Sequence, residues 1–154
     1  MKMKPLLLFL TILIFATSCE HSSFFEKVHS FPKHEWSSSE TPAFQFEVQD
    51  SAATYQLFFV FRHTDAYHFK NIWLQLHILA PDSSYSINRE FTLADNNKWL
   101  GTGMDDIYEH RILFSPQPIR LQKGNYTFRL QQIMREDPLL NVMNAGIRVQ
   151  KIIP

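Results

Sequence analysis

Two apolar stretches decide the fold class: Tyr55–His63, which reads YQLFFVFRH, and Ile72–Ala80, which reads IWLQLHILA. Both are rich in aromatic and β-branched side chains, which favour strands. Apolar residues are so dense in both stretches that each is typical of a central strand covered on both faces. The sequence therefore predicts a sheet protein built around these two segments.

Further strands are expected on either side of this pair. Phe44, Phe46 and Val48 alternate with polar residues, which is the period of a half-buried strand. The other expected strands are Phe24–Phe31 at one edge, Tyr85–Leu93, Ile107–Phe114, Asn125–Ile133 and Gly146–Ile153. Turn-forming clusters separate these segments. We therefore predict an all-β fold, an antiparallel β-sandwich of about 8 strands, with one short helical turn near residues 134–143.

Two irregularities interrupt this pattern. In Tyr85–Leu93, the apolar residues share one side, and Arg89 is the exception among them. The only glycines, Gly101, Gly103, Gly124 and Gly146, lie in the last third of the chain. Each glycine is expected to mark a positive φ or a close backbone approach. The segment around the first two predicts a shaped loop, in which Trp99 either closes the end of the sandwich or faces a partner.

The start of the chain is typical of a bacterial export signal. Lys2 and Lys4 precede Leu6–Ala16, an apolar run of 11 residues. A transmembrane helix needs about 20 such residues, whereas the core of a signal peptide is shorter. The run is followed by Ala16-Thr17-Ser18-Cys19, which resembles a lipobox with Ala16 where leucine is usual.

Cys19 is the only cysteine, and we predict that it is lipidated. The expected organisation is a lipoprotein signal peptide at residues 1–18, a lipidated tether at 19–23 and a single β-sandwich domain at 24–154. The acyl chains would anchor the protein in a membrane. The alternative is an ordinary cleaved signal followed by an unmodified cysteine.

Composition excludes several classes of protein. The chain has 154 residues, 45% of them hydrophobic, and 15 basic residues balance 15 acidic ones. A chain of this kind is globular rather than disordered. Zero formal net charge argues against nucleic-acid binding, which needs a basic face.

Motifs for metal binding and catalysis are missing from the sequence. His63, Asp65 and His68 are close in sequence, but neither HExxH nor paired CxxC spacing is present. Neither GxSxG nor SxxK occurs. The adjacent acids Asp105-Asp106 and Glu136-Asp137 would point to opposite faces of a strand and form no ready-made pair. We therefore expect no metal, no cofactor, no catalytic residues and no enzymatic activity.

The chain resembles the GldH gliding-motility lipoprotein family of Bacteroidetes over nearly its whole length. The residues that carry the resemblance are Trp36, Arg62-His63-Thr64, Tyr67, Asn71, Trp73, Trp99-Leu100-Gly101, Gly103, Asp106, Ile107, Gly124, Tyr126, Phe128, Gln132, Met134, Arg135, Val142, Gly146 and Arg148. The resemblance implies an accessory or scaffold lipoprotein of the gliding machinery, which is linked to type IX secretion. It brings no known enzyme activity or cofactor, and other envelope proteins of the machinery are the implied partners.

Seven residues are candidates for binding such a partner: Arg62, His63, Tyr67, Asn71, Trp99, Asp106 and Arg135. Arginine and tyrosine are enriched at interface hot spots, and loops on a rigid scaffold often carry recognition. In the alternative interpretation, Arg62 and Arg135 pair with Asp65, Asp106 or Glu136 and only fix loops.

A second functional hypothesis is a carbohydrate-binding sandwich with Trp73, Trp99 or Tyr67 as exposed stacking platforms. The expected location is the outer membrane. Glu20-His21-Ser22-Ser23 lacks an acidic run, which favours the periplasmic face over surface export.

Overall fold

The computed structural model describes residues 24–152, which form strands and connections without a helix. The predicted signal peptide and lipidated tether lie outside the described residues. Eight strands have six or more residues: β1 (Phe24–Ser30), β3 (Ala43–Val48), β4 (Thr54–Thr64), β5 (Asn71–Leu79), β6 (Ser84–Thr92), β10 (Ile107–Leu113), β12 (Gly124–Gln132) and β14 (Val142–Ile152). The shorter ones are β2 (Glu35–Trp36), β7 (Ala94–Asp95), β8 (Lys98–Trp99), β9 (Thr102–Met104), β11 (Ile119–Arg120) and β13 (Leu139–Leu140).

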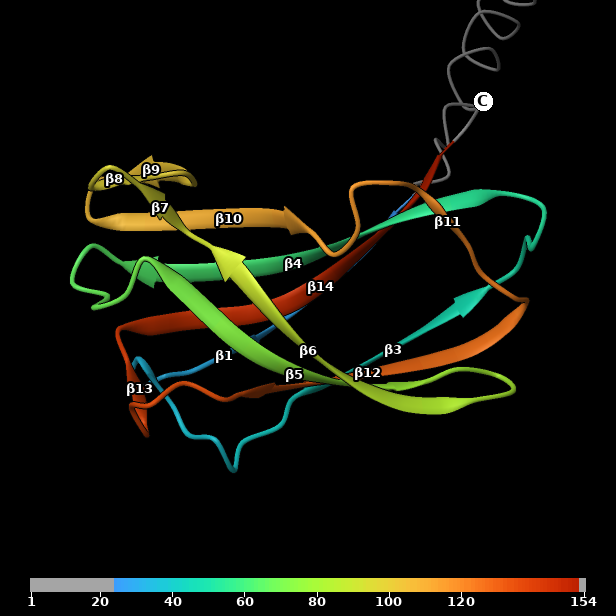
Figure 1. Cartoon of the computed structure of the whole chain (residues 1–154), viewed down its shortest axis with the longest axis horizontal. Helices are drawn as coiled ribbons and strands as arrows, with labels where there is room; N and C mark the ends of the chain where they lie inside the picture. Colours follow the sequence, from blue (N-terminus) through green and yellow to red (C-terminus); the bar gives the residue numbers. More distant parts are fainter. Residues whose placement is uncertain (1–23, 153–154) are drawn as a thin grey trace, which may run out of the picture.

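Two antiparallel sheets form the two layers of the domain (Figure 1). The six-stranded sheet has the order β1-β14-β4-β10-β9, with β11 also paired to β4. The four-stranded sheet has the order β3-β12-β5-β6. Aromatic rings join the two inner faces: Phe59 of β4 lies 4.8 Å from Phe91 of β6, and Phe25 of β1 lies 5.6 Å from Phe46 of β3, between ring centroids. The predicted antiparallel sandwich is confirmed.

The two stretches that predicted the fold form β4 and β5, and both strands are central. β4 pairs with β14 and β10, and β5 pairs with β12 and β6. The expectation that both faces are covered is wrong for β5. Its inner residues are buried, but Trp73 and Leu79 on its outer face remain 40% and 43% exposed. In the described part of the chain, the outer face of the four-stranded sheet has no further layer over it.

The short helical turn expected near residues 134–143 does not form. Leu139 and Leu140 instead make the strand β13, in which Leu139 pairs with Trp36 of β2. Both of these side chains are fully buried. The extended conformation is favoured over a helical turn because it places Leu139 in the core beside the indole of Trp36.

Two glycines show the two roles expected of this residue type. Gly124 has a φ of 137°, in the region that favours glycine. Gly146 of β14 pairs with Val28 of β1, and a Cβ atom at Gly146 would lie only 2.1 Å from the carbonyl oxygen of Lys27. Gly146 therefore permits β1 to approach β14 closely.

Candidate functional site

The seven predicted partner-binding residues are divided between the interior and the surface. His63 and Tyr67 are buried, Asn71 and Trp99 are half-buried, and Arg62, Asp106 and Arg135 are exposed. The structure therefore does not bring them together on one accessible surface.

The buried members belong to a group that we call the histidine cluster: His63, His110, Tyr67, Trp99 and Tyr108. The Nε2 atoms of His63 and His110 lie 2.9 Å apart. His63 donates from Nδ1–H to the carbonyl oxygen of Thr64 at 2.8 Å. In the neutral ring Nε2 must then accept, so the Nε2–H of His110 is the donor between the two histidines.

Aromatic rings pack around His63 of this pair. Trp99 approaches His63 edge-on with a centroid distance of 4.4 Å, and Tyr67 lies at 5.0 Å. Trp99 also donates from Nε1 to the carboxylate of Asp65 at 2.8 Å. Trp99 thus packs against the core and closes this end of the sandwich, as one of its two predicted roles requires.

Burial keeps both histidines neutral. It lowers the pKa of His63, against the opposing effects of the Thr64 carbonyl and the Asp65 carboxylate. Burial, followed by repulsion from His63, lowers the pKa of His110 to about 4. Burial also raises the pKa of Tyr67, whose hydroxyl donates to the carbonyl oxygen of Asn71 at 3.0 Å. The histidine cluster is therefore uncharged at neutral pH, with His63, His110 and Tyr67 buried and Trp99 and Tyr108 half-buried around them.

The aromatic residues considered as stacking platforms do not share an exposed face. Tyr67 is buried and Trp99 packs against His63. Trp73 lies on the outer face of the four-stranded sheet, where its backbone N–H donates to the sulfur of Met134.

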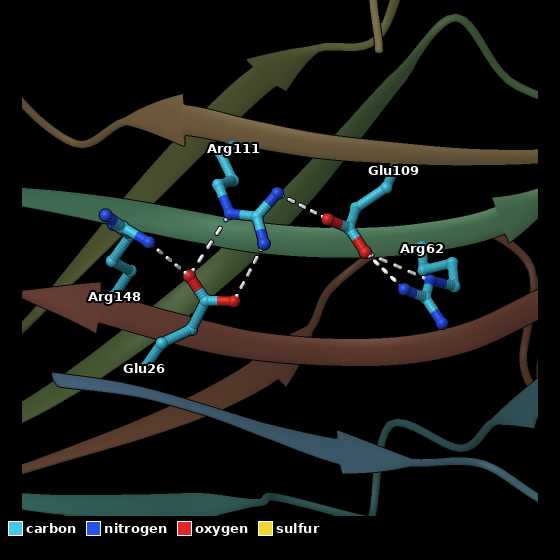
Figure 2. Close-up of polar contacts among 5 residues, drawn as sticks. All are labelled: Glu26, Arg62, Glu109, Arg111 and Arg148. Atoms are coloured by element: carbon cyan, nitrogen blue, oxygen red, sulfur yellow. Dashed lines mark hydrogen bonds and ion pairs between the residues drawn. The ribbon is translucent and has the colours of Figure 1, made fainter. Parts of the chain in front are cut away.

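An array of charged side chains crosses the outer face of the six-stranded sheet (Figure 2). We call it the ion-pair ladder, and its members are Glu26 of β1, Arg148 of β14, Arg62 of β4, and Glu109 and Arg111 of β10. Arg111 donates to both carboxylate oxygens of Glu26, from Nε at 3.1 Å and from Nη2 at 2.9 Å. Arg148 donates from Nη1 to Glu26 at 3.0 Å. Glu109 accepts hydrogen bonds from both Arg62 and Arg111.

Small residues in the intervening strands make this crossing possible. Arg111 lies opposite Val60 of β4, and Val60 lies opposite Gly146 of β14. Gly146 has no side chain, the side chain of Val60 is short, and Val60 is buried beneath the charges. The long side chains of Glu26 and Arg111 can therefore meet above two strands that separate their backbones.

The ladder stays ionised at neutral pH. Hydrogen bonding to Arg111, and then to Arg148, holds the pKa of Glu26 below its ordinary value despite partial burial. For Glu109, burial acts to raise the pKa, but Arg62 and Arg111 together outweigh it, so the pKa is lowered. Arg62 pairs with Glu109, not with Asp65, Asp106 or Glu136 as considered from the sequence.

Exposed apolar side chains flank one end of the ladder. Met104 of β9 is 77% exposed and Leu100, just before β9, is 59% exposed. A surface hollow of about 360 Å³ lies between the ladder and β9, and Met104, Arg62 and Arg111 are among the residues that line it. Charged and apolar groups therefore meet on the same face.

Residues 24–152 contain neither a metal-binding cluster nor a helix that could span a membrane. No group of three or more His, Cys, Asp or Glu side chains in this range could hold a metal ion. In the same range, no helix is long and apolar enough to cross a membrane.

Comparison with known proteins identifies the family of this chain. The family model described as GldH lipoprotein matches residues 23–149. The chain belongs to the GldH lipoprotein family. Among its relatives, the gliding motility lipoprotein GldH homolog of Christiangramia forsetii is 26% identical over 153 residues, covering 94% of this chain and 93% of the relative. Gliding motility lipoprotein GldH of Flavobacterium johnsoniae is 26% identical over 159 residues, covering 97% of each.

Two solved structures resemble the GldH-family domain distantly. Dimeric latent PorU from Porphyromonas gingivalis has a TM-score of 0.39 at 10% identity, covering 84% of this chain and 12% of PorU. A carbohydrate-binding module specific for non-crystalline cellulose, CBM28, has a TM-score of 0.37 at 14% identity, covering 82% of this chain and 69% of the module. Neither likeness is close enough to say anything about function. The family itself supports a lipoprotein of gliding motility that is associated with a membrane of the cell envelope.

Sequence reasoning about this GldH-family chain missed most of the ladder and one of the two histidines. Glu26, Glu109, Arg111 and His110 were not among the candidates. A signal was present in Ile107–Leu113, where Glu109 and Arg111 fall on one side of the strand and His110 on the other. That alternation indicates a charged outer face, but the partners of each charge depend on strand pairing.

Proposed function

We propose that the protein is a lipid-anchored, non-enzymatic accessory or scaffold component of a gliding-motility envelope complex linked to type IX secretion. A lipid on Cys19 would hold it in the outer membrane, with the domain on the periplasmic side. Membership of the GldH family supports the motility role. The partner in this proposal is another envelope protein of the machinery.

The observation that carries a binding role is the junction of the ion-pair ladder with Met104 and Leu100. Arginine and methionine are enriched at protein interfaces, where an apolar centre is surrounded by polar contacts. Arg62 and Arg111 are each held by carboxylates, so less side-chain entropy is lost when they bind. The guanidinium groups of Arg62 and Arg111, which line the hollow beside Met104, favour a partner that presents carboxylates beside an apolar side chain.

We expect the double substitution Leu100→Glu/Met104→Glu to abolish assembly without unfolding the protein. Both side chains are largely exposed, and surface substitutions usually change stability by less than about 0.5 kcal/mol. New carboxylates at an apolar contact would remain desolvated and unpaired in a complex. The measurement is quantitative mass spectrometry of proteins that co-purify with the tagged lipoprotein from cross-linked native membranes.

Leu79→Glu is the matched control, because Leu79 is also an exposed leucine but lies on the outer face of the four-stranded sheet. It should leave the set of co-purifying proteins unchanged. An unchanged set in a stably expressed Leu100→Glu/Met104→Glu protein would remove this face from the proposal and leave the family assignment intact.

The anchor has its own test. We expect Cys19→Ala to release the protein from membranes, since acyl chains would supply the attachment. Membrane fractionation together with incorporation of labelled fatty acid checks this. A Cys19→Ala protein that still pellets with membranes and incorporates fatty acid would show that Cys19 is not the lipidated residue.

A further inference from the structure

A hollow of about 270 Å³ lies between the two sheets near Tyr55, at the opposite end of β4 from His63. It exists because β10 ends at Leu113, so no long strand continues beside β4. The chain returns only as β11, which pairs with two residues of β4, Tyr55 and Thr54. The connection from Phe114 to Leu121 therefore forms one wall, and β6 forms the other.

The residues on the inner face of β6 become more exposed from Phe91 toward Tyr85, where the strand borders this hollow. Phe91 is 3% exposed, Ile87 is half-buried and Tyr85 is 51% exposed, although all three alternate on the same side of the strand. Deeper in the hollow, Leu76 and Phe128 are buried. The hollow thus has an apolar floor and an accessible rim.

Arg89 is the only charged residue among those that line the hollow. It pairs across the strands with Leu74, which is fully buried, so Arg89 lies on the inward face of β6. Among residues 24–152, no carboxylate forms an ion pair with Arg89, in contrast to the arginines of the ladder, which are bound to glutamates. The inward-facing side of β6 therefore carries an exposed cation at the edge of the apolar hollow, with no counter-ion among the residues described.

We propose that this hollow binds a medium-chain fatty acid, with its alkyl chain between the sheets and its carboxylate on Arg89. The guanidinium presents two parallel N–H donors that match a carboxylate. Ligand pockets range from about 300 to 1,000 Å³, and this hollow is close to the lower end, which suits a single alkyl chain. The site is on the other side of β4 from the ion-pair ladder and is independent of the partner surface.

Photo-crosslinking of the full-length protein in native membranes tests the site. The probe is decanoic acid with a diazirine in its alkyl chain, and the labelled peptides are mapped by mass spectrometry. We expect labelling of the segments around Ile87 and Ile119. Decanoate should compete, whereas decyltrimethylammonium, with the same chain and the opposite charge, should not. Competition should strengthen about fourfold for each added methylene until the hollow is full.

Three variants separate the site from general membrane contact. Arg89→Gln should weaken competition by decanoate about three- to fivefold, since the charge pair is partly exposed to water. Ile87→Trp should fill the hollow and abolish labelling. Arg129→Gln, on the outer face of the four-stranded sheet, is the matched control and should label as the wild type does.

Thermal unfolding of each variant checks that it is folded, and Ile119→Trp at the rim replaces Ile87→Trp if the latter does not fold. Three results would each overturn the proposal: equal labelling of a folded tryptophan variant and the wild type, equal competition by the two head groups, or crosslinks confined to other segments.

Discussion

Replacing Phe59 by alanine is expected to destabilise the domain by about 3–5 kcal/mol, the usual cost of removing a buried phenylalanine. Phe59 has no exposed surface. Its ring lies 5.4 Å from Phe61 along β4 and 4.8 Å from Phe91 on the opposite sheet. The substitution therefore leaves a cavity where the two sheets meet, and neighbouring rings can fill it only in part. Thermal unfolding followed by circular dichroism should show a melting temperature at least about 10 °C lower.

The neighbouring residue supplies the control. Phe58 is on the outer face of the same strand, where it is only half-buried beside Leu113 and Arg148. Phe58→Ala should cost less than half as much as Phe59→Ala, because water already reaches part of the ring. Equal losses for the two variants would mean that β4 does not present alternate residues to the core.

Acidification below neutral pH is expected to weaken the fold through the histidine cluster. The pKa of His110 is about 4 in the folded protein and about 6.5 in an unfolded chain. The unfolded state therefore binds more protons than the folded state between these values, so stability falls as pH falls. Between about pH 7.5 and 5, His110 alone should lower the free energy of unfolding by about 2 kcal/mol. The lowered pKa of His63 acts in the same direction.

The control variants isolate this effect. His110→Gln removes one titrating group and should flatten the pH dependence of urea unfolding over that range. His68→Gln is the control for the histidine-to-glutamine change itself, since His68 lies at the surface beside Glu136. The window lies above the ordinary pKa values of carboxyl groups, so the ladder glutamates, whose pKa values are lowered further, remain ionised. An unchanged slope in His110→Gln would show that the buried pair does not control acid sensitivity.

The strands were predictable because the pattern that forms them is local. Phe44, Phe46 and Val48 alternate in the sequence, and they are buried in the same alternation in β3. The error at residues 134–143 has a different origin. Whether Leu139 is helical or extended is decided by Trp36, which is distant in sequence and reaches it only after the chain has folded.

The candidate site was predictable only in part, because its contacts also join residues that are distant in sequence. Arg62 was recognised as a candidate from its position, but its partner Glu109 is 47 residues away. The contact between Glu26 and Arg111 joins residues 85 apart. Which acid meets which base depends on strand order and on Gly146, which allows β1 to lie close to β14. A single sequence shows the charges on a strand, but not the strand that will lie beside it.

The position of β1 has a mechanical consequence. This edge strand pairs with β14 at every residue from Phe24 to Ser30. If the chain is anchored in a membrane through Cys19, β1 would be the first described element to bear tension from the anchor. Tension along its axis loads the inter-strand hydrogen bonds in shear, so they must break together. Tension across the sheet would open them in turn, like a zipper, beginning at Phe24. Glu26, bound to Arg111, would carry part of that load across the sheet to β10.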